Sequence, residues 1–154
     1  MKKVEVPPAS SLSIVPWSCR DLSQPVLLSV IQTMKAILLV DHGSRLRDAN
    51  EMLAEVAALV SRESPEYHVE YAHMELAEPT IDQGFDACVE AGAQEITVHP
   101  YMLSPGRHAT QDIPRLVKAA AGRHPGIRYH VTAPLGLHAL LAKVVLDRVR
   151  EAGG

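Results

Sequence analysis

Two short stretches of the sequence combine residue types that can carry out metal and proton chemistry. They are DHGSR, residues 41–45, and SPGRH, residues 104–108. Each contains a glycine, an arginine and a histidine: Gly43, Arg45 and His42 in the first, and Gly106, Arg107 and His108 in the second. An imidazole can bind a divalent ion or accept a proton near neutral pH, and glycine lets the backbone and a ligand approach closely. The two stretches are therefore the candidate site.

Each stretch follows an apolar segment of strand length. Such segments predict four strands, at residues 35–41, 67–74, 95–103 and 127–135. The second of these alternates more between apolar and polar residues, which is typical of an edge strand. Apolar residues at helical spacing predict four helices, at residues 46–62, 80–91, 110–124 and 137–152. Strict alternation predicts one α/β domain of three layers, βαβαβαβα, with helices on both faces of a four-stranded parallel sheet.

The strand order decides whether the two stretches meet. In open parallel sheets, ligands bind beyond the carboxyl ends of the strands, where the strand order reverses. With the order 2-1-3-4, this point lies between the first and third strands, so the loops at 41–45 and 104–112 face each other. The loop after the second strand, ELAEP, adds Glu75 and Glu78 to the same edge.

Two imidazoles with a carboxylate nearby and no thiolate suit Fe²⁺, Co²⁺, Ni²⁺ or Zn²⁺ better than Mg²⁺ or Ca²⁺. Two histidines are too few for a closed structural site, so a metal would be held loosely, for transfer. Structural alternatives stay open. Either histidine could be a hydrogen-bonded loop residue, the glutamates could stabilise a helix start, and the arginines, Arg115 included, could form a solvated rim. His73 and His138 lie near strand ends, and their roles also stay open.

Composition excludes several classes of protein. With 154 residues and 47% hydrophobic content, the chain can form one domain with a sizeable core. A formal net charge of −3 and the lack of a basic cluster argue against nucleic-acid binding. Every apolar run is far shorter than the roughly 18 residues of a membrane span. Cys19 and Cys88 fit neither a disulfide framework nor a CxxC motif, which suggests the cytoplasm. Cys88 is expected in the core.

Residues 1–33 differ from the rest of the chain. They contain four of the eleven prolines and a serine-rich tract, without a sustained helix or strand period. We interpret them as an N-terminal extension that is disordered or not native, followed by a domain at residues 34–154. A transit peptide, and hence a plastid location, would need more arginines than Arg20 alone.

Four motifs in this order resemble a known family. They are LLVDHGSR (38–45), AHMELAEPTI (72–81), PYMLSPGRHATQDIP (100–114) and TAPLGLHALLAKVVLDRV (132–149). Together they resemble the small sirohydrochlorin chelatases, the CbiX/SirB type of class II tetrapyrrole chelatase, over residues 35–150. The spelling DHGSR, where many bacterial and archaeal members have GHGSR, is most similar to the plant-type sirohydrochlorin ferrochelatases.

The resemblance implies a lyase that inserts a divalent metal into sirohydrochlorin and releases two protons, with Fe²⁺ and siroheme biosynthesis favoured. His42 and His108 correspond to the family's paired metal-binding and proton-accepting histidines, and Glu75 or Glu78 to the acidic partner. The substrate carries many carboxylates, which gives the residues around the crevice a binding role: Gly43, Ser44, Arg45, Gly106, Arg107 and Arg115. No tightly bound cofactor is implied, since Fe²⁺ or Co²⁺ is the substrate metal.

The resemblance also implies a homodimer, because larger class II chelatases resemble two such domains fused. Some plant-type members add a cysteine-rich segment for an iron–sulfur cluster, but this chain has no cysteine after Cys88, so we expect no cluster. Three alternatives remain: a cobaltochelatase for cobalamin biosynthesis, a non-catalytic metal or tetrapyrrole carrier, and a phosphatase that forms a phospho-histidine at HGSR.

Overall fold

The computed structural model describes residues 33–154. Its elements are β1 (Lys35–Asp41), α1 (Arg47–Glu63), β2 (Tyr67–His73), α2 (Ile81–Glu90), β3 (Glu95–Pro100), the π-helical turn η1 (His108–Asp112), α3 (Ile113–Ala121), β4 (Arg128–Val131) and α4 (Ala139–Ala152). The predicted N-terminal extension and Cys19 lie outside the described residues, except that the extension's last residue, Thr33, is included.

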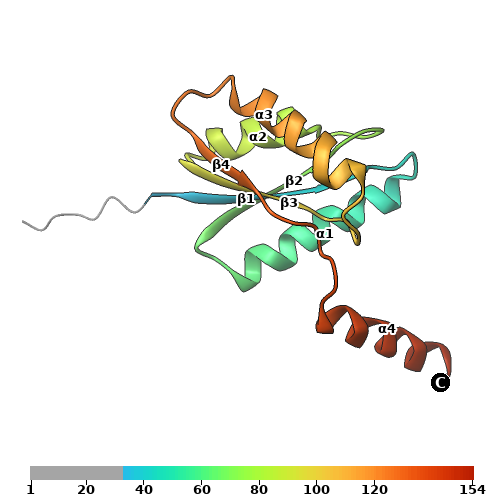
Figure 1. The fold of residues 1–154 in the computed structure, drawn as a ribbon. Coiled ribbons are helices and arrows are strands. Elements are labelled where there is room, and N and C mark those ends of the chain that lie inside the picture. The colour runs from blue at the N-terminus through green and yellow to red at the C-terminus, as the bar shows by residue number, and fades with distance from the viewer. Residues whose placement is uncertain (1–32) are drawn as a thin grey trace, which may run out of the picture. The chain divides into compact units, whose positions relative to one another are not determined.

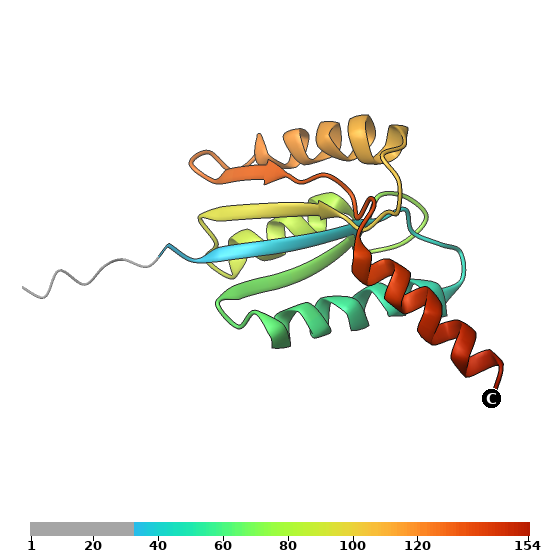
Figure 2. The ribbon, with the colours of Figure 1, turned by 60° about the horizontal axis from the view of Figure 1, so that its bottom comes forward.

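The four strands form one parallel sheet in the order β2-β1-β3-β4, which confirms the predicted fold and the edge position of the second strand. Figure 2 shows this order from the green β2 to the orange β4. Figure 1 shows α1 on one face of the sheet and α2 with α3 on the other. Because β1 pairs on both sides, its carboxyl end lies between those of β2 and β3, where Asp41 is in register with His73.

The core has two parts, one on each face of β1. Alternate residues of a strand point to opposite faces. Ala36, Leu38 and Val40 pack into the larger cluster with Phe85, and Leu39 packs into the smaller cluster with residues of α1. Cys88 is fully buried in the larger cluster, as predicted, and burial raises the pKa of its thiol to about 12. The thiol is therefore protonated at neutral pH and acts as a small apolar group.

Helix α2 carries clear boundary signals. Thr80 accepts a hydrogen bond from the backbone N–H of Gln83, and the Gln83 side chain accepts one from the backbone N–H of Thr80. This reciprocal capping box satisfies donors that the first turn leaves unpaired. After the helix, Gly92 adopts a φ of +95°, a conformation that costs glycine little. The predicted end of this helix at Gly92 is therefore confirmed.

The third strand and the helix after it differ from the predicted bounds. β3 ends at Pro100 rather than at 103, because the chain turns there and the Met102 N–H donates to the Pro100 carbonyl. The following helix begins at His108, earlier than predicted, with the wide turn η1 in which the Ile113 N–H donates to the His108 carbonyl. Pro114 lacks an N–H, so it cannot continue an ordinary α-helical ladder through this turn. His108 is thereby part of a helical turn rather than of a free loop.

Helix α4 forms close to the predicted range but buries none of its residues. Its apolar side chains are exposed; Leu140 and Val149, for example, are each 63% exposed. Figure 1 shows α4 apart from the three layers of the sheet and helices. The strand before it, β4, is also shorter than predicted and ends at Val131. No helix of residues 33–154 is long and apolar enough to cross a membrane.

Substitution of Gly84 would test how closely α2 packs on the sheet. A Cβ atom at this position would lie 2.8 Å from Leu38 Cδ1 and 3.0 Å from Ala72 Cβ. In an exposed helix, glycine-to-alanine substitution stabilises by about 1 kcal/mol, whereas forcing a methyl group into a packed core costs about 1–3 kcal/mol. We expect Gly84→Ala to lower the free energy of unfolding by about 1–2 kcal/mol in urea denaturation. A gain in stability would contradict this packing.

Candidate active site

The structure brings the two predicted histidines into contact. His42 follows β1 and His108 begins η1, and their ring centroids lie 5.2 Å apart with an angle of 69° between the ring planes. Both residues are exposed at the carboxyl edge of the sheet. This edge lies between β1 and β3, where the strand order reverses. Two imidazoles from segments far apart in the sequence are thus available to one ligand.

Hydrogen bonds leave the same nitrogen free on both rings. His42 Nδ1 lies 3.2 Å from the Gly43 carbonyl oxygen, and His108 Nδ1 lies 3.0 Å from Asp112 Oδ2. With the proton on each Nδ1, both bonds are donated by the ring and each Nε2 keeps a lone pair for a metal ion or a proton. A carboxylate behind an imidazole, as Asp112 is behind His108, is the usual way in which proteins orient a metal-binding histidine.

Asp112 was not among the predicted site residues. Its spacing of four residues from His108 is the signal that could have identified it, since such pairs lie on the same side of a helix. The Arg107 guanidinium also lies near this carboxylate, with Nε 3.7 Å from Asp112 Oδ2. The Asp112 carboxylate is therefore close to both Arg107 and His108 of the SPGRH stretch.

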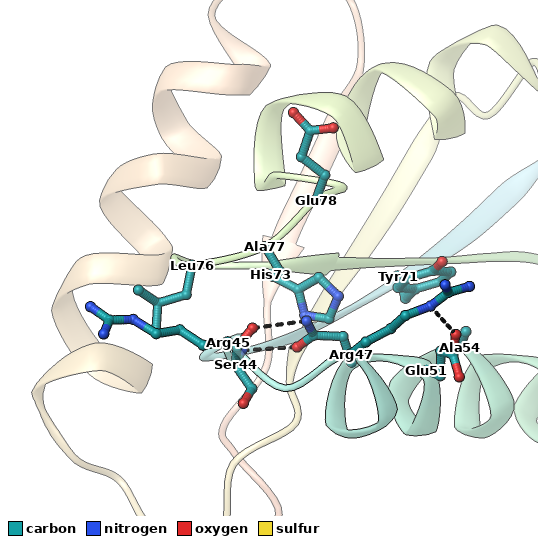
Figure 3. Close-up of a pocket in the computed structure, with 11 residues that line it drawn as sticks. Ser44, Arg45, Arg47, Glu51, Ala54, Tyr71, His73, Leu76, Ala77 and Glu78 are labelled. Carbon is teal, nitrogen blue, oxygen red and sulfur yellow. Dashed lines mark hydrogen bonds and ion pairs between the residues drawn. The ribbon is translucent and has the colours of Figure 1, made fainter.

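The predicted carboxylates do not complete a metal site in this structure. Glu75 and Glu78 are exposed in the loop after β2, and in Figure 3 the Glu78 carboxylate points away from the neighbouring His73. Within residues 33–154, no group of three or more His, Cys, Asp or Glu side chains is arranged to hold a metal ion. Of the four predicted metal-binding residues, only His42 and His108 are in contact. A metal-binding role for Glu75 or Glu78 stays a prediction.

Gly43 allows two loops to touch. Its φ is +83°, and a Cβ atom there would overlap the carbonyl oxygen of Glu75. In the same contact the Glu75 N–H donates to the His42 carbonyl over 3.0 Å. The missing side chain of Gly43 therefore makes room for the loop after β2, not for a ligand. Gly106 differs, because a Cβ atom there would meet nothing within 4 Å.

A buried polar pair lies beneath the DHGSR stretch. His73 is fully buried and donates from Nδ1 to Asp41 Oδ1 over 2.6 Å. The same oxygen accepts from the Gly43 N–H over 2.9 Å, so Asp41 fixes the turn that carries His42. Sequence reasoning left His73 open, and the signal that pairs it with Asp41 is the parallel register of β1 and β2.

The predicted arginines are exposed but differ in their partners. Arg107 is close to Asp112, whereas neither Arg45 nor Arg115 takes part in an ion pair within residues 33–154. Ser44 is held by Asn50, which accepts from the Ser44 N–H and donates to its carbonyl. Two unpaired guanidinium groups are therefore available to anionic ligands at this edge.

Each of the four segments that follow a strand also exposes a leucine. These residues are Leu46, Leu76, Leu103 and Leu137. The segments after β1, β2 and β3 also carry polar residues of the site, whereas the segment after β4 contributes Leu137 alone. The edge therefore combines imidazole, guanidinium and apolar groups, which suits a ligand with a flat apolar body and an acidic periphery.

Known proteins that are similar to this chain show its family. The CbiX family model matches residues 36–152. The chain belongs to the CbiX family. It is 45% identical over 133 residues to the chloroplastic sirohydrochlorin ferrochelatase of Arabidopsis thaliana, covering 86% of this chain and 59% of that protein. This relative also bears out the predicted similarity to plant-type ferrochelatases.

Solved structures of CbiX-like proteins have the same fold. The sirohydrochlorin chelatase SirB from Bacillus subtilis subspecies spizizenii in complex with cobalt has a TM-score of 0.72 and 37% identity, over 77% of this chain and 51% of that one. A putative cobalamin biosynthesis CbiX protein from Marinobacter aquaeolei has a TM-score of 0.64 and 28% identity, over 77% of this chain and 96% of that one. The chain thus spans 59% of the Arabidopsis protein and about half of the Bacillus one, but nearly all of the Marinobacter one.

The two glycines of the site should respond differently to substitution. Gly43→Ala places a side chain at a positive φ and against the Glu75 carbonyl, so we expect a loss of about 2–4 kcal/mol in the free energy of unfolding. Gly106→Ala is the matched control, with an expected change below about 0.5 kcal/mol because the position is open. Thermal unfolding of both variants measures the difference, and equal stability would show that the two loops do not touch.

Proposed function

We propose that the chain is a sirohydrochlorin chelatase, a lyase that inserts a divalent metal ion into sirohydrochlorin and releases two protons. The observation that carries the proposal is the exposed His42–His108 pair, with Nε2 free on both rings. Membership of the CbiX family and the names of its relatives support the same reaction. Since nothing in this scheme consumes a nucleotide, the product is favoured by the four nitrogen ligands of the macrocycle alone.

The two imidazoles would perform two of the three difficult steps. The ion must lose water, the macrocycle must bend, and two pyrrole N–H groups must lose their protons. Imidazoles held at a fixed separation can replace water on the ion and then accept a proton once the ion has passed to the macrocycle. Asp112 would hold the His108 ring in position and stabilise its protonated form.

The remaining edge residues would bind the substrate. Guanidinium groups form strong paired hydrogen bonds with carboxylates, which assigns Arg45 and Arg115 to the acidic arms of the macrocycle. Arg107 would share its charge between Asp112 and an arm. Ser44 and Gly106 lie in the same loops, and the exposed leucines offer apolar contact to the flat face. Glu75 or Glu78 would add negative charge that attracts the incoming ion.

Iron is the proposed ion, with siroheme biosynthesis as the pathway, because the Arabidopsis relative is named a ferrochelatase. Cobalt, and with it cobalamin biosynthesis, is the second candidate, because the Bacillus structure is described in complex with cobalt. Imidazole suits both ions, and selectivity between them commonly depends on geometry and metal supply.

The decisive experiment follows the visible spectrum of sirohydrochlorin under anaerobic conditions with Fe²⁺, Co²⁺ or Ni²⁺. We expect the wild type to accelerate insertion and His42→Ala and His108→Ala each to lower the rate by about 100-fold or more, since each removes a ligand and a proton acceptor. The matched control is His130→Ala, because His130 lies within β4 and bonds Thr97 instead.

Three outcomes would contradict the chelatase proposal. Binding of metal or tetrapyrrole without faster insertion would indicate a carrier. Metal-independent hydrolysis of phosphate esters that requires His42 would indicate a phosphatase. Insertion that is equally fast in the two histidine variants would place the chemistry elsewhere.

We also propose that two copies of the chain form a dimer through α4. The helix buries none of its own residues and exposes an apolar set: Leu140, Val144, Val145, Leu146 and Val149. Burial of apolar surface drives association, and exposed apolar patches mark interaction sites. The chain also spans 51% of the Bacillus SirB structure, so a second copy would supply a second unit of similar size.

Substitutions on α4 test the dimer. We expect the wild type to sediment at twice the mass of the 16.8 kDa chain. Val145→Glu combined with Val149→Glu should raise the dissociation constant at least about tenfold, because burying a charge in an apolar interface is costly. Lys143→Glu is the control on the same helix and should leave the mass unchanged. A monomeric wild type, or a dimer insensitive to both substitutions, would refute the role of α4.

A further inference from the structure

A cavity adjoins the loop that carries His42. It has a volume of about 380 Å³ and lies between the start of α1 and the loop after β2. Figure 3 shows its lining residues, with the His73 ring between Ser44 and Arg45 on one side and Tyr71 on the other. Its lining contains neither His42 nor His108, so an occupant of this cavity would contact other residues than the histidine pair.

The wall of this cavity contains an unsatisfied buried atom. His73 is fully buried and donates from Nδ1 to Asp41, while its Nε2 has no hydrogen-bond partner. No other buried side-chain nitrogen or oxygen in residues 33–154 lacks a partner. Buried polar groups are nearly always hydrogen-bonded, because an unmade bond costs free energy. Because His73 also lines the cavity, a group that enters from the cavity would supply this missing partner.

The charges around the cavity favour an anion. Arg45 lines it and takes part in no ion pair within residues 33–154, whereas Arg47 is paired with Glu51 over 2.6 Å. The cavity also includes the first turns of the 17-residue helix α1, whose N-cap residue Leu46 provides no side-chain hydrogen bond. Unpaired N–H groups at a helix start attract negative charge. Two carboxylates oppose this attraction, Asp48 in the first turn and Glu78 in the lining, and both are exposed.

We propose that this cavity binds one carboxylate arm of the tetrapyrrole substrate. The Arg45 guanidinium holds the arm at the mouth, and His73 Nε2 forms a hydrogen bond with it at the base. In the complex both ring nitrogens of His73 have a hydrogen-bond partner, Asp41 at Nδ1 and the arm at Nε2. The inference rests on the proposed function and gives a binding role to His73, a residue of the AHMELAEPTI motif whose role the sequence left open.

The arrangement would also place the macrocycle over the metal-binding pair. Asp41 accepts from both His73 and the backbone of Gly43, which is adjacent to His42. Ser44 and Asn50 hold the next residue of the loop through two hydrogen bonds. One anchored arm therefore contacts the same rigid segment that carries a metal-binding imidazole, and rigid positioning is a main source of rate acceleration.

The test measures binding of metal-free sirohydrochlorin by its visible spectrum, with no metal ion present. An asparagine amide can replace Nδ1 of a histidine and a glutamine amide can replace Nε2, so His73→Asn keeps the bond to Asp41 and removes the group that meets the arm. We expect His73→Asn and Arg45→Gln each to raise the dissociation constant about tenfold, the effect of losing one charge-assisted hydrogen bond. His73→Gln should bind within about threefold of the wild type.

Two controls separate this cavity from general effects. Arg62→Gln removes an exposed charge from the far end of α1 and should leave binding unchanged. Co²⁺ binding in the absence of substrate should stay within about twofold in the His73 and Arg45 variants, because the histidine pair is intact. The double variant Arg45→Gln with His73→Asn should lose less than the product of the two single losses, since both residues hold one arm.

The outcomes distinguish this inference from the proposed function. Unchanged sirohydrochlorin binding in both single variants, or losses that multiply independently, would overturn it. Inorganic phosphate that binds in a His73-dependent manner, when sirohydrochlorin does not, would also overturn it in favour of another anion. A wild type that binds sirohydrochlorin through His73 but inserts no metal would refute the chelatase and leave the cavity assignment standing. Because Arg45 is exposed, its variant tests the cavity even if a His73 variant fails to fold.

Discussion

The parallel pairing of β1 with β2 on one side and β3 on the other is the constraint on which the site depends. It places three carboxyl ends at one edge and gives the central one, at Asp41, a neighbour on each side. Loops that leave this edge must pass close to one another, and Gly43 makes the closest approach possible against Glu75. His42 reaches His108 on one side, and Asp41 reaches His73 on the other, because of this central position.

The His42–His108 contact and the Asp41–His73 hydrogen bond differ in their exposure to solvent. The His42–His108 pair is exposed, which suits the temporary binding of an ion that must leave again. His73 is buried and bonded to a carboxylate, which suits a fixed orientation. Hydrogen bonds to Nδ1 orient all three rings, so the protein controls which nitrogen faces a ligand. In the proposed chelatase, the exposed pair would release the metal ion and the buried pair would help to position the organic substrate.

Helix α4 shows that the described unit does not bury all the apolar surface that its sequence contains. The sheet and helices α1 to α3 form a closed core, yet α4 keeps every apolar side chain accessible. An isolated helix of this length is marginal in water, so packing against another surface would stabilise it. The chain covers 59% of the Arabidopsis relative and 51% of the Bacillus structure, so each of these relatives contains further chain that a second unit would correspond to.

The sequence by itself determined the alternation of strands and helices, the edge position of β2, the end of α2 at Gly92 and the two histidine motifs. These follow from local patterns: apolar periodicity, capping residues and glycines that need a positive φ. Tertiary structure alone decided the contact between His42 and His108, the Asp41–His73 bond, the support of His108 by Asp112 and the role of Gly43 as a contact between loops. Each of these depends on strand register or on the path of a turn, which residues far apart in the chain determine together. The exposed state of α4 was likewise undecided, because an amphipathic pattern shows that a helix has an apolar face and not which surface covers it.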